Sequence, residues 1–240
     1  MSDDHRVLKD HFVLYVDFLG VSDASTSCDE GQAGRLIKVL KTIAELRAPF
    51  SIDGEPQPDG SYKIRATPEI STFSDHIVAS YPVPDNLTIP VALLMDIYLK
   101  ILSDIAEKIA FDALSIGMLV RGALTIGKLY HSDGVVFGEA MVDAHRLESR
   151  VAIYPRVAVS SRIYGKIDLA ERKRLVLDSD GIWHLNYFSN IINQVDPAER
   201  EAWVASCVEM IDSNITSFEE NERWSEMTKW AWFKDKFSKL

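Results

Sequence analysis

The sequence has few cysteines and no excess of basic residues. Only Cys28 and Cys207 occur among the 240 residues. Two cysteines cannot build a disulfide framework, and these two lack metal-ligand spacing, which suits a reducing cytoplasm. The formal net charge is −10, whereas surfaces for nucleic acid or anionic membranes need clustered Lys and Arg. We therefore expect a cytoplasmic protein that binds no nucleic acid and holds any anion locally.

A membrane-spanning segment is also missing from the sequence. Residues 1–6 are not followed by the apolar stretch of a signal peptide. The longest apolar helical segment, 90–111, is interrupted at amphipathic spacing by charged residues, among them Asp96, Lys100 and Asp104. We expect a soluble protein without membrane insertion.

Two aspartates stand within apolar runs that are typical of buried strands. Asp17 lies in the run 13–20 and Asp75 in the run 71–80. A charge inside a buried strand is costly unless it is paired or holds a metal. If the two strands lie side by side, both carboxylates can bind one divalent cation or two. Such a pair points toward phosphoryl-transfer chemistry.

The order of apolar and amphipathic segments predicts an α/β (α+β) fold, in which helices pack on a mixed sheet. Expected strands are 12–19, 70–81 (a strand or a hairpin), 115–130 and 156–160, with a hairpin over 175–188; expected helices are 33–46, 90–113 and 139–149, followed by helices from Asp196 onward. The segment 48–61 is rich in Pro and Gly and is expected to be a loop or an excursion, not a domain boundary. A strand with one metal aspartate beside a hairpin with a second is the arrangement of palm-type nucleotide-transfer sites.

The chain resembles the class III nucleotidyl cyclase catalytic domain, and within it the bacterial pyrimidine cyclases of the Pycsar antiphage system. The matching segments are 13–20, 71–80, 116–127, 135–149 and 156–160. The resemblance implies a ferredoxin-like palm sheet flanked by helices, with a catalytic domain over 10–190. Residues 191–240 have no counterpart in it and form a C-terminal helical extension, which either packs on the domain or reinforces a dimer.

The resemblance assigns roles to individual residues. Asp17, Asp75 and the backbone carbonyl of Phe18 match the ligands of two Mn²⁺ or Mg²⁺ ions, which prefer oxygen ligands. Arg146 matches the arginine that stabilises charge on the phosphorus in the transition state. In the family this arginine comes from the partner subunit, so the resemblance implies a homodimer with sites at the interface.

Departures from the family pattern concern the base and the phosphates. Ser71 and Val135 stand where purine cyclases carry polar base-reading residues, which disfavours a purine. Phe73 and Phe137 could stack against a smaller base. The resemblance favours UTP, with CTP as the alternative.

Two further family positions differ. Val142 replaces an asparagine whose contacts Asp143 or His145 would have to supply. The late hairpin lacks a phosphate-binding lysine, for which Lys128 or Arg121 are candidate replacements.

Three functions from different classes are compatible with the sequence. The first is a cyclase whose product activates a separate effector in antiphage defence. The second is a catalytically silent nucleotide-binding module, against which both aspartates and Arg146 argue. The third is an unrelated metal-dependent phosphohydrolase that uses Asp17 and Asp75.

Overall fold

The computed structural model describes residues 7–21, 30–45, 50–56, 62–84, 90–167 and 174–239, and only the backbone of 50–56 and 62–66. Three sequence expectations lie outside these ranges wholly or in part: the missing signal peptide at 1–6, the thiol of Cys28, and the loop at 48–61. Within the described ranges, no helix combines the length and hydropathy needed to cross a membrane.

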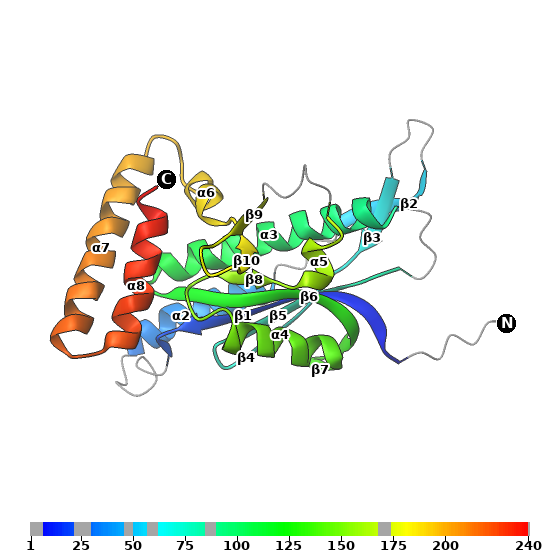
Figure 1. Ribbon diagram of the computed structural model, residues 1–240, viewed down its shortest axis with the longest axis horizontal. Helices are drawn as coiled ribbons and strands as arrows, with labels where there is room; N and C mark the ends of the chain where they lie inside the picture. Colours follow the sequence, from blue (N-terminus) through cyan, green and yellow to red (C-terminus); the bar gives the residue numbers. More distant parts are fainter. Residues whose placement is uncertain are drawn as a thin grey trace.

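Four antiparallel strands form the centre of the sheet in the order β4-β5-β1-β6 (Figure 1). They are β1 (Lys9–Leu19), β4 (Glu69–Phe73), β5 (His76–Pro82) and β6 (Leu119–Ser132). Helix α2 (Glu30–Ala44) lies between β1 and β4 in the chain, and α3 (Val91–Ser115) between β5 and β6. The sequence β1-α2-β4-β5-α3-β6 with this strand order is the ferredoxin-like arrangement, which confirms the predicted fold class.

Shorter elements extend this centre into an eight-stranded sheet. Strand β8 (Val157–Val159) pairs with β6 in parallel, and β10 (Trp183–Leu185) and β9 (Leu175–Leu177) follow it outward. Strand β7 (Val135–Phe137) pairs with the curved end of β6 and leads into helix α4 (Glu139–Arg150). The short helix α5 (Ser161–Tyr164) follows β8.

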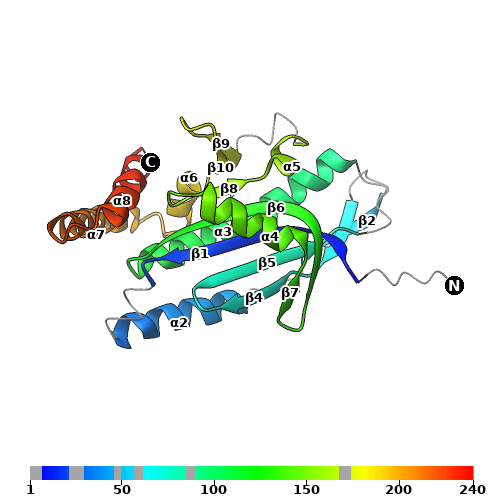
Figure 2. The same cartoon turned by 60° about the horizontal axis from the view of Figure 1, so that its bottom comes forward.

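Side-chain alternation along β1 divides the molecule into two layers. Phe12, Leu14, Val16 and Phe18 belong to the large core beneath α2 and α3. Val13 and Tyr15 pack instead with α4 on the other face of the sheet, and Figure 2 shows these helices on opposite faces. Because alternate residues of a strand share a face, Asp17 lies on the same face as Tyr15, beneath α4.

The C-terminal part is helical, as predicted. It comprises α6 (Phe188–Ile191), the 3₁₀ helix η2 (Ile192–Gln194), α7 (Arg200–Glu220) and α8 (Trp224–Phe237). Helices α7 and α8 stand side by side at the end of the sheet where β1 ends (Figures 1 and 2). Trp230, Phe233 and Phe237 of α8 are buried in the large core, so the aromatic residues anchor this helix.

For the described part of 48–61 the loop alternative is wrong, and the segment is an excursion from the main sheet. Residues Phe50–Pro56 form β2, which pairs with β3 (Tyr62–Ala66) in a separate two-stranded sheet. Its register shifts at Asp53, Gly54 and Glu55, all of which face Lys63. A bulge accommodates turn-forming residues within a strand, so the Asp-Gly pair marks a bulge here.

Candidate functional site

Asp17 lies in the middle of a polar row that crosses three strands. The strand register places His76 of β5 on one side of Asp17 and Arg121 of β6 on the other. Directly opposite residues of antiparallel strands project from the same face and contact each other. Arg121 Nε donates a hydrogen bond to Asp17 Oδ2 at 3.0 Å, and His76 Nε2 lies 3.5 Å from Asp17 Oδ1. The row therefore follows from register, not from proximity in the sequence.

Glu148 of α4 approaches the same arginine from above the sheet. Its Oε1 lies 2.5 Å from Arg121 Nε, and its side chain is 1% exposed. Burial raises the pKa of Glu148 to about 6. Burial also raises the pKa of Asp17, although the hydrogen bond and charge of Arg121 oppose the shift.

The sequence interpretation did not identify Glu148. A signal was present, because Ala140, Ala144 and Glu148 recur at four-residue spacing and form the buried stripe of α4.

Asp75 lies at the tip of the β4–β5 hairpin, so the hairpin interpretation of 70–81 is confirmed. The register leaves Ser74 and Asp75 as a two-residue loop, and Ser74 has φ of 53°, as primed hairpin turns require at this position. The Phe18 N–H donates to the Asp75 carbonyl at 3.1 Å. The N–H and C=O of one strand residue point to the same edge, so the Phe18 carbonyl also faces the hairpin tip.

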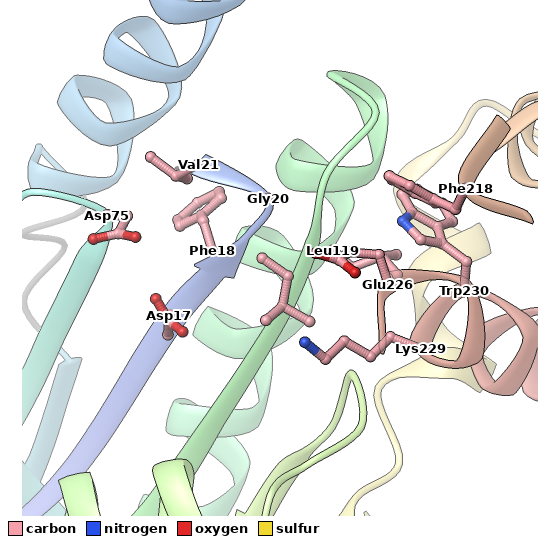
Figure 3. A pocket seen from close by; sticks show the side chains of 11 residues that line it. Asp17, Phe18, Gly20, Val21, Asp75, Leu119, Phe218, Glu226, Lys229 and Trp230 are labelled. Carbon is pink, nitrogen blue, oxygen red and sulfur yellow. The ribbon is translucent and has the colours of Figure 1, made fainter. Parts of the chain in front are cut away.

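A pocket of about 230 Å³ opens beside both aspartates. One wall consists of the end of β1, the β4–β5 tip and Leu119 of β6. The opposite wall belongs to α7 and α8, from which Phe218, Glu226, Lys229 and Trp230 line the cavity (Figure 3). The sequence interpretation left the role of these C-terminal helices open and placed none of them at the site.

The side chains at this site fit a divalent cation. Ligand atoms of Asp17, Asp75 and His76 lie within 4.8 Å of one another. Arg121 pairs with Asp17 and Glu148, and Asp75 joins the cluster through His76 at 3.0 Å. The three ionised carboxylates thus exceed the single arginine by two negative charges when His76 is neutral. Carboxylate oxygens suit Mg²⁺ and Mn²⁺. His76, absent from the predicted ligand set, adds an imidazole donor.

Phe73 and Ser71 lie near the hairpin in different surroundings. The Phe73 ring is 45% exposed and stacks on the His76 ring with centroids 5.3 Å apart. The Ser71 hydroxyl is within hydrogen-bond distance of His131 Nε2 (2.9 Å), and His131 Nδ1 reaches Ser80 at 2.8 Å. Ser71 therefore contacts a buried histidine, whereas Phe73 flanks the candidate metal ligands.

The other predicted site residues do not line the aspartate pocket. Arg146 is exposed on α4 and lines a second cavity of about 310 Å³, next to Thr125 and Ser160. Lys128 pairs with Asp10 at 3.0 Å, and it lies seven residues from Arg121, about 23 Å along an extended strand. Val135 and Phe137 of β7 are exposed beside the far end of β6.

The two candidate replacements for a phosphate-binding lysine are thus both paired. Lys128 contacts Asp10, and Arg121 contacts Asp17 and Glu148.

No family model and no curated protein matches this sequence. Solved structures give weak overlaps. A bacterial light-regulated adenylyl cyclase is 12% identical over 75% of this chain and 52% of its own, with a TM-score of 0.42. An adenylate/guanylate cyclase/hydrolase from Silicibacter pomeroyi is 14% identical over 74% and 96%, with a TM-score of 0.38.

A third overlap is with the catalytic core of a rhodopsin-guanylyl cyclase of converted specificity in complex with ATPαS. It is 15% identical over 74% of this chain and 96% of that core, with a TM-score of 0.39. The chain spans about half the length of the light-regulated cyclase.

Proposed function

We propose that this protein is a nucleotidyl cyclase that converts UTP into 3′,5′-cyclic UMP and pyrophosphate. The observation that carries the proposal is the meeting of Asp17 and Asp75 at one pocket, in a cluster with two excess negative charges. Such a cluster suits divalent cations, and cations held there would neutralise the negative charge of a polyphosphate substrate.

Asp17, Asp75 and the Phe18 carbonyl would hold two Mn²⁺ or Mg²⁺ ions. Such ions would make the ribose 3′-hydroxyl more acidic and would neutralise charge on the triphosphate. The 3′-oxygen attacks the α-phosphorus, the bond from that phosphorus to the β-phosphate oxygen breaks, and pyrophosphate leaves while the hydroxyl proton passes to solvent. Arg121 keeps the Asp17 carboxylate oriented through its 3.0 Å hydrogen bond.

The active form is proposed to be a homodimer whose sites lie at the subunit interface. The pocket of about 230 Å³ is smaller than typical ligand sites of about 300–1,000 Å³, so a whole nucleotide needs further walls. Arg146 is exposed on α4 and lines a different cavity of its own chain, which leaves its guanidinium available to a partner's substrate. Residues 10–190 would form the catalytic domain and 191–240 its helical extension.

A pyrimidine is favoured over a purine as the base. Ser71 contacts His131, and Val135 is apolar, so neither offers the polar pattern that reads a purine edge. The exposed rings of Phe73 and Phe137 provide stacking surfaces. Lys128, on β6 next to β7, would contact the substrate only from a partner subunit.

Incubation with Mn²⁺ and each of the four ribonucleoside triphosphates, followed by mass identification of products, tests the proposal. The expected products are cyclic UMP and pyrophosphate, absent in the Asp75→Asn variant. Asp133→Asn is the matched control, since Asp133 lies in the β6–β7 turn with φ of 53°, which asparagine also tolerates. If cyclic CMP alone is formed, the substrate is CTP and not UTP. If cyclic AMP or cyclic GMP alone is formed, the pyrimidine assignment is overturned. Release of free phosphate or UMP would indicate a phosphohydrolase.

The product is proposed to act on a separate effector protein in antiphage defence, as the sequence resemblance implies. Protection of bacteria against phage by the chain together with its effector, and loss of protection with Asp75→Asn, would support this role. Unchanged protection with an inactive cyclase would exclude it.

A further inference from the structure

Helix α8 carries a lysine on its inward face. Glu226, Lys229, Trp230 and Phe233 follow the three- and four-residue spacing that keeps side chains on one side of a helix. Trp230 and Phe233 are buried, and Lys229 is partly buried with them. Lysine rarely lies on a buried face without an anionic partner.

Lys229 interacts electrostatically with Glu226, three residues earlier on α8, and its charge helps to lower the pKa of that carboxyl group. Its neighbour Glu226 pairs with Arg223 at 2.8 Å, and Lys229 forms no ion pair with a described residue. Asp17 and Asp75 line the same pocket, and Figure 3 shows the Lys229 side chain extending from α8 toward β6, which lies between Lys229 and the β1 strand of Asp17. Lys229 therefore lines the same pocket as Asp17 and Asp75 without forming an ion pair with either of them.

The side chains that line this pocket indicate which kind of ligand it can bind. A ligand that fills it must present negative charge to Lys229 and bind divalent cations held by Asp17 and Asp75. A polyphosphate does both, because its oxygens chelate metals at one end and accept hydrogen bonds from an ammonium group at the other. The volume of about 230 Å³ suits a few phosphate groups and not a whole nucleotide.

Helix α8 is fixed firmly enough to position this lysine. Lys236, further along α8, donates to Asp178 of the β9–β10 hairpin at 2.7 Å. The Trp232 ring stacks on Tyr154 with centroids 5.4 Å apart. Helix α8 is thus attached at two places, by Trp230 in the core and by Lys236 at the hairpin.

We propose that Lys229 binds the terminal phosphates of the substrate, so that the C-terminal helices form part of the active site. The proposal rests on the proposed function for the identity of the substrate, and on the pocket itself for the polyphosphate. In this proposal the C-terminal helices take part in substrate binding. Lys229 of α8 replaces the phosphate-binding lysine that the β9–β10 hairpin lacks.

Calorimetric titration of inorganic tripolyphosphate in the presence of Mn²⁺ tests the proposal without any turnover. Lys229→Met should weaken tripolyphosphate binding roughly tenfold to hundredfold, since a charge-assisted hydrogen bond is lost. Lys234→Met is the matched control on the same helix, because Lys234 pairs with Asp212 of α7, and it should bind as wild type does. Lys229→Arg should recover part of the affinity, and Lys229→Met should keep its affinity for Mn²⁺ alone.

Unchanged tripolyphosphate affinity in Lys229→Met, equal losses in both methionine variants, or no binding by the wild type would each overturn the proposal. Its failure can be told from failure of the cyclase assignment. If tripolyphosphate binding depends on Lys229 but no cyclic product forms, the role of Lys229 in binding stands and the cyclase assignment falls. If Lys229→Met forms cyclic product with an unchanged KM, the cyclase assignment stands and the role of Lys229 falls.

Discussion

The molecule contains two arginine-centred charge clusters that differ in balance and in exposure. Arg121 faces Asp17 and Glu148 beside an open pocket, and Asp75 adds a further carboxylate there. Arg156 is 1% exposed and contacts Asp178 at 3.1 Å and Asp180 at 2.5 Å, while Lys236 supplies a second cation to Asp178. The second cluster thus has two cations for two carboxylates, and the first has one cation for three.

The pKa shifts of the carboxyl groups follow this difference. In the balanced cluster, burial is the largest single influence on Asp178 and pushes its pKa upward, but the hydrogen bond and charge of Lys236, together with His184 and the Ser179 N–H, lower the pKa overall. The hydrogen bond from Arg156 lowers the pKa of Asp180. In the open cluster, burial raises the pKa of both Asp17 and Glu148. A buried carboxylate with a paired cation becomes costly once that cation is removed, whereas excess carboxylates at a pocket are candidates for a functional site.

The largest expected effect is the loss of Arg156. Arg156→Met leaves Asp178 partly uncompensated in a buried position and should lower the free energy of unfolding by about 3–5 kcal/mol. Arg121→Met should cost about half as much, because Asp17 and Glu148 can take up protons and the pocket admits water. Urea denaturation at pH 7 measures both, and equal losses would contradict the distinction between the clusters.

The second prediction is that Mn²⁺ stabilises the folded protein by binding at the open cluster and not at the balanced one. At a free Mn²⁺ concentration one hundred times the Kd, the wild type should gain about 2.7 kcal/mol in free energy of unfolding. Asp75→Asn should gain little, whereas Asp180→Asn should gain as much as the wild type. Thermal unfolding with and without Mn²⁺ is the measurement, and an equal gain in both variants would place the metal elsewhere.

The third prediction is a pH dependence with a defined sign. The pKa of Glu148 rises from 4.5 to about 6 on folding, so the unfolded chain releases this proton first as the pH increases. In metal-free buffer, Glu148 should therefore contribute a loss of stability between pH 4.5 and 6 of at most about 2 kcal/mol. The lowered pKa values of His11 and His131 act in the opposite direction over this range, so the measured quantity is the difference in free energy of unfolding between Glu148→Gln and wild type, which should change with pH between 4.5 and 6.

Asp180→Asn is the contrasting variant for this experiment. In the wild type, folding lowers the pKa of Asp180, which stabilises the fold above pH 3.8, and this stabilisation is lost at lower pH. The difference in free energy of unfolding between Asp180→Asn and wild type should therefore diminish only below about pH 4. If Glu148→Gln kept the wild-type slope between pH 4.5 and 6, the raised pKa would belong to another group.

The smallest expected effect belongs to an exposed pair outside both clusters. Lys234 and Asp212 are 43% and 47% exposed, so Lys234→Met should change the free energy of unfolding by less than about 1 kcal/mol. Lys236→Met, which removes a cation from Asp178, should cost more. Chemical denaturation of the two variants side by side compares them, and the reverse order would make the α7–α8 contact more important than the hairpin contact.

Local sequence patterns predicted those helices, strands and turns whose conformation depends mainly on their own residues. The apolar run around Asp17, the amphipathic segment 90–113 and the turn before Trp183 correspond to β1, α3 and the β9–β10 hairpin. The same patterns identified Asp17 and Asp75, because a charge in an apolar run is conspicuous without any knowledge of its neighbours.

Long-range partners were beyond those patterns. Arg121 meets Asp17 only because β1 and β6 pair in one particular register, although 104 residues separate them. A shift of one residue would turn Arg121 to the other face of the sheet. The position of Lys229 at the pocket was beyond the sequence for a similar reason, since only tertiary packing decides which end of the sheet α8 covers.

The distance in sequence between β1 and β6 also affects how the chain folds during synthesis. Leu19 pairs with Leu119 and Lys9 with Leu129, so one edge of β1 has no strand partner until the ribosome has added at least 100 further residues. At about 5–20 residues per second, that edge waits for roughly 5–20 seconds. An apolar strand with an open edge is a template for wrong pairing, so nascent chains of this protein should depend on chaperones that shield β1 during this interval.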